Sequence, residues 1–568
     1  MGTIVKFKPN IDYYYTRGLK QYESDNFAEA ICDYREAYRM AENGAGEEFR
    51  AILEVEMACC YRNLHLLREA QLMYYKALCD SNPDTAFDSI LGLIDIFGTG
   101  GNDEALKYYM DMAAKRGFSR ELDYIEAASQ FFAQRDYRVE PSPDKNMLDL
   151  GRKLIEAEQF AFARQLLEGI PSGSPHYEEA CMSLAALYNM PGGDSEKALA
   201  YLEKVKTPKY PAELLINKAM AYCNEERFSD FADTLDEIEE LDPDDVTSLS
   251  HIVRVSAHFG RADLVIKFGR KLQRLSPERS AMLCYAIALS NRGDLREARK
   301  IMVQLQALYP FDARVRIFAE LIAQCTYKTD LPLRGDLPDG IEDELLGSLN
   351  EALNECGNDR AALRAALRAP EYRTAILLVF KAGSENSKRI LADVVAEIPF
   401  FERYIRDCLM DPGFPDADKR ILLPVAIKRF RRRPLYLTCR DVCRPLFGKP
   451  NAKTLGKWRE AYCAAFGAIA LFGCENFERE FDAVFQKLRD ALSDEEEIND
   501  AAVAAVLAHR MRVVPPLGDD ECCIELFGAD RETYFAYKRK AAGGNGRKKM
   551  TGKEESSLSR RKKTHEEN

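Results

Sequence analysis

Two cysteines in the stretch "TCRDVC", Cys439 and Cys443, are the best-spaced candidates for metal chemistry. If this stretch is helical, the two thiols lie on successive turns and could hold the same ion. A zinc site needs about four ligands, and no second pair of cysteines or histidines follows at ligand spacing. We therefore predict no metal and no cofactor.

Other residue patterns give no catalytic arrangement. The chain has six histidines and no HExxH motif, and its carboxylates are too abundant for one acid–base pair to be singled out. His251 and His258 lie two turns apart on one predicted helix, where they could face one groove or simply be partly exposed. The glycine-rich stretches 98–101 and 543–546 do not join a strand to a helix, as phosphate-binding loops do. We predict that the protein is not an enzyme.

Basic residues gather in two places. The stretch "KRFRRR" (428–433) would spread its cations around a helix with Phe430 buried, either to hold an anionic partner or as a solvated helix end. Residues 538–568 hold 11 Lys/Arg and 4 Asp/Glu, which gives a charge of +7. Because the whole chain carries −12, the preceding residues carry −19. The tail 542–568 is almost without apolar residues, which predicts disorder. It could fasten to nucleic acid or only aid solubility.

Composition limits the class of protein. A chain of 568 residues with 46% apolar and 30% charged residues suits a folded, helix-rich protein of several domains or one long solenoid. No apolar run approaches the length that spans a bilayer, so no membrane partner is expected. The opening residues lack secretory features, and Lys6 stands where myristoylation needs Ser or Thr. With sixteen scattered cysteines, this favours reduced thiols in the cytoplasm.

One phrase recurs through the first half of the chain. A small residue, often Gly or Ala, precedes an alanine by about twelve residues, and a large apolar residue follows the alanine four positions later. Small residues allow two paired helices to approach closely, while proline ends the second helix. The recurring alanines are Ala30, Ala70, Ala105, Ala163, Ala198 and Ala298, and the large residues are Tyr34, Tyr74, Tyr109, Leu167, Leu202 and Met302.

This pattern resembles the tetratricopeptide repeat (TPR) family, whose helical hairpins stack into a superhelix. The resemblance implies an all-α fold in which residues 1–328 form a TPR superhelix with a capping helix at 311–326. The seventh unit departs most, with Val265 and Gly269 in place of an alanine and an aromatic residue. The units span 11–44, 47–83, 86–119, 144–171, 177–209, 212–243, 246–277 and 279–310.

The second half lacks this code. Residues 329–342 are rich in Pro, Gly and Asp and are predicted to be a linker. A helical domain over 343–494 follows, part of which resembles HEAT-like helical pairs, and no strand is expected. Residues 495–541 resemble a helix-turn-helix with Gly528 in its turn.

Two classes of function remain open. TPR proteins bind partners along the concave face formed by the first helix of each hairpin, which implies a non-enzymatic adaptor or scaffold for a peptide or helix, polar or acidic in character. Residues expected on that face are Arg62, Asn63, Arg152, Asn224, Arg254, His258 and Asn291.

The alternative is a nucleic-acid-associated regulator that uses the C-terminal hairpin and the basic tail. Asp530 and Glu532 weaken this hypothesis because they stand at the start of the second helix of the hairpin, where phosphates would repel them. The candidate nucleic-acid contacts are Arg531, Thr533, Lys538, Arg539 and Lys540.

Overall fold

The computed structural model describes residues 10–41, 47–79, 83–100, 102–118, 143–156, 159–357, 359–432, 434–448, 452–471, 477–511 and 519–542. Helices make up nearly all the regular structure of these residues, which confirms the predicted all-α class. The chain divides into two compact units, 1–384 with 411–413 and 385–410 with 414–568. The division falls between α21 and α22, after the predicted linker at 329–342.

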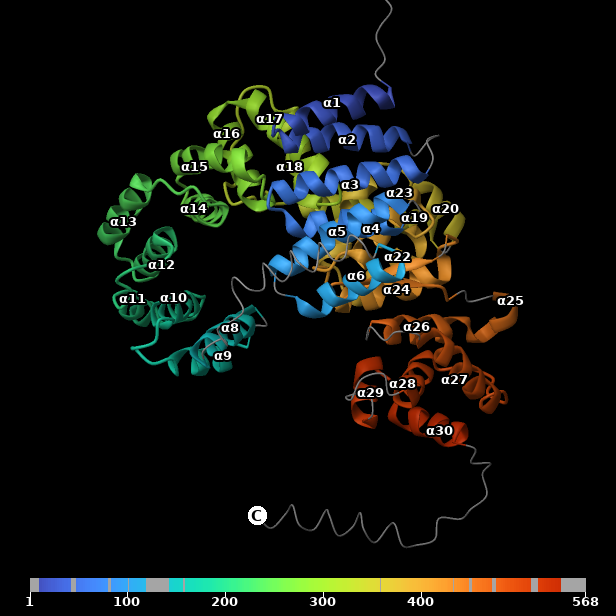
Figure 1. The fold of residues 1–568 in the computed structure, drawn as a ribbon. Coiled ribbons are helices and arrows are strands. Elements are labelled where there is room, and N and C mark those ends of the chain that lie inside the picture. Colours follow the sequence, from blue (N-terminus) through green and yellow to red (C-terminus); the bar gives the residue numbers. More distant parts are fainter. Residues whose placement is uncertain are drawn as a thin grey trace, which may run out of the picture. The chain divides into compact units, whose positions relative to one another are not determined.

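Helices of the first unit pair as successive hairpins, in which each helix packs against its neighbours along the chain (Figure 1). The N-terminal hairpins comprise α1 (Ile11–Glu23), α2 (Phe27–Ala41), α3 (Glu47–Asn63), α4 (Leu67–Cys79), α5 (Pro83–Gly100) and α6 (Asp103–Lys115). Residues 119–142, which fall between the predicted third and fourth repeat units, lie outside the described residues. Helix α5 continues to Gly100, so Gly98 and Gly100 are helical.

A second series of hairpins follows, and a last helix, α18, stands where the capping helix is predicted. Figure 1 shows these helices following one another from teal to lime. They are α8 (Pro143–Glu156), α9 (Phe160–Glu168), α10 (Tyr177–Tyr188), α11 (Ser195–Leu202), α12 (Pro211–Asn224), α13 (Phe228–Glu240), α14 (Val246–His258), α15 (Ala262–Leu275), α16 (Arg279–Arg292), α17 (Leu295–Leu308) and α18 (Ala313–Gln324).

The recurring alanines lie at the helix crossings, as their spacing predicts. All six are fully buried at 0% exposure, and the large residues that follow them are at most 2% exposed. Close packing of this kind stabilises a hairpin only when neighbouring hairpins cover its remaining apolar surface. The repeated phrase therefore encodes packing and not chemistry.

At two helix crossings a glycine faces an aromatic ring. A β-carbon on Gly92 of α5 would stand 2.2 Å from Cζ of Tyr74, and one on Gly269 of α15 would stand 2.6 Å from Cγ of Tyr285. Gly269 explains the irregular seventh unit, because its missing aromatic side chain is replaced by Tyr285 from the next helix. The contact still pairs one small residue with one large residue, but here the large residue belongs to the next helix.

The first two hairpins also contact the last one. Gln304 of α17 donates to Glu29 of α2 at 2.9 Å, and the hydroxyl of Tyr61 on α3 donates to the carbonyl of Leu308 at 3.0 Å. These partners are separated by 275 and 247 residues, respectively. In a simple solenoid each repeat contacts only its neighbours. This unit therefore has a long-range contact that its repeat pattern does not predict.

The first unit ends with α19 (Ile341–Cys356), α20 (Arg360–Ala366) and α21 (Tyr372–Ala382). Helix α21 packs against α18 and α19. Between α18 and α19, Leu331, Leu333 and Leu337 pack against the core of α12–α18. The segment predicted as a linker is thus part of the packed first unit.

The second unit is helical apart from one short hairpin of strands. It contains α22 (Glu385–Val395), α23 (Pro399–Met410), α24 (Asp416–Arg429), β1 (Leu435–Cys439), β2 (Val442–Leu446), α25 (Ala452–Leu455), η1 (Gly456–Trp458), α26 (Arg459–Ala470), α27 (Phe477–Ala491), α28 (Asp500–Met511), α29 (Asp520–Phe527) and α30 (Arg531–Ala541). Helix α28 packs against α26, α27, α29 and α30, and Ala502–Ala508 are all buried. An apolar helix of this kind forms the centre of its domain.

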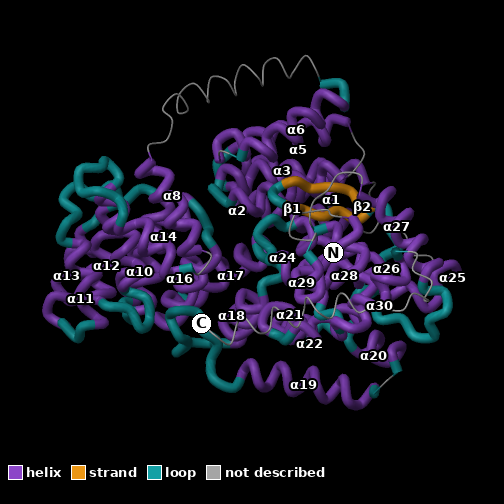
Figure 2. Tube along the Cα trace, turned by 90° about the horizontal axis from the view of Figure 1, so that it is seen from below, coloured by secondary structure: helices purple, strands orange, loops and turns teal. Residues whose placement is uncertain are grey.

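The strands contradict the expectation that the chain has none. β1 and β2 pair antiparallel, with Leu435 opposite Leu446 and Cys439 opposite Val442 (Figure 2). The prediction that Cys439 and Cys443 occupy successive helical turns is therefore wrong. Arg440 and Asp441 form the two-residue connection, both with positive φ (48° and 62°), as tight hairpin turns require.

No helix among the described residues is both long enough and apolar enough to cross a membrane.

Candidate protein-interaction surface

The residues expected on the binding face all lie on the first helix of a hairpin. We call this set the first-helix face: Arg62 and Asn63 of α3, Arg152 of α8, Asn224 of α12, Arg254 and His258 of α14, and Asn291 of α16. Helices α8, α10, α12, α14 and α16 contact one another in series, so five of the seven residues lie on one run of adjacent helices. Arg62 and Asn63 lie on α3 in the N-terminal hairpins.

Three asparagines of this face occupy the same register. Asn63, Asn224 and Asn291 each follow a fully buried alanine (Ala58, Ala219 and Ala286) by five residues. Their amides have different partners. Asn63 donates to the carbonyl of Cys59 on its own helix at 2.9 Å, whereas Asn224 donates to Ser195 Oγ of the preceding hairpin at 3.1 Å.

Asn291 binds an extended stretch of the chain itself. Its Nδ2 donates to the carbonyl of Leu331 at 2.7 Å, and its Oδ1 accepts from the backbone N–H of Leu331 at 2.9 Å. The hydroxyl of Thr329 donates to the same Oδ1 at 2.6 Å, and its backbone N–H donates to the carbonyl of Ser290 at 3.2 Å. One side chain therefore pairs with both backbone groups of a single peptide residue, whatever that residue's side chain.

This segment, residues 329–337, runs antiparallel to α16. Thr329 lies at the C-terminal end of the helix, whereas a β-carbon on Gly335 would be 3.0 Å from Leu283 Cδ2, nearer its start. The segment explains why α16 is buried on all sides from Ala281 to Ser290. Sequence reasoning placed Asn291 on the binding face but did not anticipate that the protein fills that position with its own chain.

The charged residues of the first-helix face are partly neutralised by acids. Arg62 pairs with Asp95 of α5 at 3.0 Å, and Arg152 pairs with Glu179 of α10 at 3.0 Å. These acids were not predicted as site residues. Asp95 follows Gly92 by three positions, the register that buried Tyr61 holds after Ala58, so alignment of the repeats alone would not have placed it on this face.

Arg152 lines a pocket of about 720 Å³ between α8, α10, α12 and the loop after α11. Glu179 and Glu213 are on its wall, together with three lysines of the loop, Lys204, Lys206 and Lys209. The pKa of Glu213 is raised because the side chain is buried, although the nearby Arg152 partly offsets this increase. Charges of both signs suit a polar peptide, and the Glu179 carboxylate pairs with the Arg152 guanidinium.

Helix α14 presents Arg254 and His258 as exposed side chains, with the His258 ring 5.1 Å from that of Phe259. His251, two turns earlier, is half-buried, and burial followed by the charge of Arg254 lowers its pKa. Both histidines thus stand on one helix, as predicted, with a cation between them. Such an arrangement favours a neutral His251, which can form a hydrogen bond with a peptide group.

Acids gather on α3 and α5. Burial raises the pKa of Glu56, and the carboxylate of Asp88 raises it further. The pKa of Asp88 is also raised, first by burial and then by Asp84. This part of the surface is acidic, in contrast with the acidic ligand that the arginines and asparagines alone suggest.

Replacing Glu56 with glutamine should reduce the pH dependence of stability. A carboxyl group whose pKa is higher in the folded state stabilises the fold below its unfolded pKa, and this contribution is lost as the pH rises through the folded value. The parent protein should therefore lose more stability than Glu56→Gln between about pH 4 and pH 7. Urea unfolding at several pH values tests this, with the exposed Glu23→Gln as control. Identical pH profiles for the parent and Glu56→Gln would contradict it.

The other candidate groups have structural partners. Cys439 and Cys443 are buried, and burial raises the pKa of the Cys439 thiol to about 11, which disfavours the metal-binding thiolate. Within the described ranges, no cluster of three or more His, Cys, Asp or Glu side chains could hold a metal ion.

The basic stretch 428–433 is not a continuous helix as expected. Helix α24 ends at Arg429, which pairs with Asp393 at 2.8 Å, while Lys428 pairs with Glu460 at 2.5 Å. Phe430 is buried, as predicted, and Arg433 lies outside the described residues. The two best-placed cations of the stretch therefore hold the second unit together.

The C-terminal hairpin forms with Gly528 in the left-handed conformation (φ 58°), as its sequence predicts. Its cations are largely paired with acids of the same unit. Arg531 pairs with Glu521 at 2.7 Å, Lys538 with Asp520 and Lys540 with Glu495.

Two candidate nucleic-acid contacts of this hairpin remain. The hydroxyl of Thr533 donates to Asp530 at 2.7 Å as part of the cap of α30. Arg539 is exposed. The glycine-rich stretch 543–546 and the rest of the basic tail lie outside the described residues.

No model of a known protein family matches this chain, and the search of curated proteins found no match.

Proposed function

We propose that this protein is a non-enzymatic adaptor, resembling TPR proteins, that binds an extended peptide of a partner protein along the first-helix face. The observation that carries the proposal is the pairing of Asn291 with both backbone groups of Leu331. A face that holds the backbone of one extended segment has the donors and acceptors to hold another. Neighbouring side chains then supply specificity.

The charged members of the face support a polar ligand. Exposed Arg254 lies on α14, between the helices that bear Asn224 and Asn291, and Glu179, which pairs with Arg152, lies on α10 next to α12. Side chains of both signs would accept a peptide that carries its own acids and bases. We propose a cytoplasmic location, since sixteen cysteines suit a reducing compartment.

The alternative of a nucleic-acid-associated regulator gains no support from the described residues. Arg531, Lys538 and Lys540 already pair with carboxylates. A phosphate would have to displace these acids, and each unpaired acid would then repel it.

The chain's own segment offers a direct test. A labelled peptide corresponding to residues 329–337 should not bind the parent protein, because the tethered copy competes at an effective concentration of about millimolar. The variant Leu333→Ser/Leu337→Ser, which weakens the apolar contacts of the tethered copy, should bind the peptide in fluorescence polarisation. Adding Asn291→Ala to that variant should weaken binding about tenfold or more.

A modified peptide distinguishes recognition of the peptide backbone from nonspecific binding. Methylation of the Leu331 backbone nitrogen removes the N–H that Asn291 accepts and leaves every side chain unchanged. This peptide should bind several-fold more weakly. The proposal fails if the released variant keeps the parental circular dichroism but binds neither peptide, or binds both equally well.

A further inference from the structure

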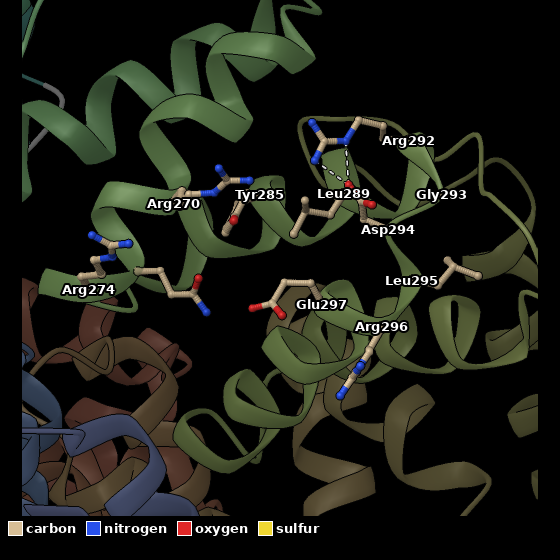
Figure 3. A pocket seen from close by; sticks show the side chains of 11 residues that line it. Arg270, Arg274, Tyr285, Leu289, Arg292, Gly293, Asp294, Leu295, Arg296 and Glu297 are labelled. Carbon is tan, nitrogen blue, oxygen red and sulfur yellow. Dashed lines mark hydrogen bonds and ion pairs between the residues drawn. The ribbon is translucent and has the colours of Figure 1, made fainter. Parts of the chain in front are cut away.

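A second pocket, of about 610 Å³, opens among α15, α16 and α17, and the first-helix face does not contribute to it (Figure 3). All four of its basic residues are arginines: Arg270, Arg274, Arg292 and Arg296. Arginine presents a planar fork of donors that matches phosphate oxygens, and pockets of this size hold small molecules.

Three of these guanidinium groups are available to a ligand. Arg292 pairs with Asp294 at 2.6 Å, whereas Arg270, Arg274 and Arg296 are exposed and form no hydrogen bond or ion pair with any described residue. Because the three come from two different helices, they border the pocket from separate sides (Figure 3).

Tyr285 supplies a neutral donor at the same pocket. The residue is only 2% exposed, its ring packs against Gly269, and it lines the pocket. Its hydroxyl makes no hydrogen bond within the described part of the chain. The hydroxyl is therefore free to donate to a ligand oxygen in the pocket.

The N-terminus of α17 also borders the pocket. Asp294 stands at the cap position, but its carboxylate does not cap the helix and instead pairs with Arg292. The first backbone N–H groups of the helix, at Leu295, Arg296 and Glu297, therefore have no partner among the described residues. Free N–H groups and the helix dipole at such an end attract anions, and phosphates above all.

Glu297 is the opposing feature. Its carboxylate turns toward the pocket in Figure 3, where it would repel an anion at close range. The three available arginines outweigh this single charge. A carboxylate is also an acceptor for hydroxyl groups, so Glu297 suits the non-phosphate part of a ligand.

We propose that this pocket binds a small molecule that carries at least two phosphate groups. The arginines hold separate phosphates, the N-terminus of α17 and the Tyr285 hydroxyl complete the shell of donors, and Glu297 accepts from a hydroxyl. The site is independent of the peptide-binding function proposed above.

Calorimetric titration of the full chain tests the proposal with ATP, inositol hexakisphosphate and pyrophosphate as probes. At least one should bind with one molecule per chain, more weakly as salt rises. Arg270→Gln and Arg274→Gln should each weaken binding about tenfold or more, while Arg254→Gln, a matched change on α14, should leave it unchanged. Comparison of the probes distinguishes a nucleotide from a phosphorylated polyol.

Two further variants distinguish a specific binding site from nonspecific electrostatic attraction. Tyr285→Phe keeps the ring against Gly269 and should weaken binding several-fold with an unchanged melting temperature, whereas Glu297→Gln should strengthen it. Absence of binding by all three probes at millimolar concentration overturns the proposal. It is overturned equally if Arg254→Gln weakens binding as much as Arg270→Gln, or if hexaglutamate, titrated in the same way, binds more tightly than each of the three phosphate probes.

Discussion

Replacement of Gly92 by leucine is expected to lower the free energy of unfolding of the first unit by about 1–3 kcal/mol. A β-carbon at this position would lie 2.2 Å from Cζ and 2.5 Å from Cε2 of Tyr74. The ring cannot move aside easily, because Tyr74 is 1% exposed and is held between α3 and α5. Urea unfolding followed by circular dichroism measures the loss.

Gly98 provides a matched control on the same helix. A β-carbon there meets no atom within 4 Å, so Gly98→Leu tests the same change in helix propensity without the clash. It should leave stability unchanged or raise it by about 0.5–1 kcal/mol. Equal midpoints for the two variants would mean that the close crossing of Gly92 and Tyr74 does not exist in solution.

The hairpins could be predicted from the sequence because close helix packing requires particular residue sizes at short, fixed spacings. A small residue, an alanine twelve positions later and a large residue four positions beyond are all needed for one crossing, and they recur together. Gly92 and Gly269 show the limit of such alignment. Where the aromatic ring comes from the next unit, as with Tyr285, the small and the large residue of one contact lie in two different units, so the pattern cannot be recognised within one unit.

The strand hairpin was missed for a different reason. β1 lacks the clean alternation of a half-buried strand, because Thr438 is buried together with Leu437 and Cys439, and the run is only five residues long. Its turn is formed by Arg440 and Asp441, whereas hairpin turns are usually recognised by Asn-Gly or Asp-Gly. Helical neighbours on both sides favoured the helical prediction.

Part of the candidate site could be predicted, but its occupant could not. Repeat register alone placed Asn291 on the first helix of its hairpin, and the structure agrees. That residues 329–337 return to fill this position depends on a contact forty residues away, between Asn291 and Leu331. The Pro, Gly and Asp content of that segment resembles that of a free linker, and only Leu331, Leu333 and Leu337 indicate that it packs.

Replacement of Phe481 by alanine should destabilise the second unit by about 3–5 kcal/mol, the largest effect of any substitution considered for this protein. Phe481 is 0% exposed, and its ring lies 5.2 Å from those of Tyr462 and Phe466 and 5.9 Å from that of Phe485. Four aromatic rings packed in this way leave a large cavity when one is removed.

The only tryptophan of the chain, Trp458, reports on this cluster. It is 5% exposed, with its ring 6.3 Å from that of Phe485, so its fluorescence should follow unfolding of the second unit. Phe481→Ala should shift the fluorescence transition to lower urea, whereas Phe447→Ala, at a ring that is 59% exposed, should change stability by no more than about 0.5 kcal/mol. Gly92→Leu acts in the other unit and should shift the circular dichroism transition more than the fluorescence. If Phe481→Ala and Phe447→Ala shift the fluorescence midpoint equally, Phe481 is not the centre of the core.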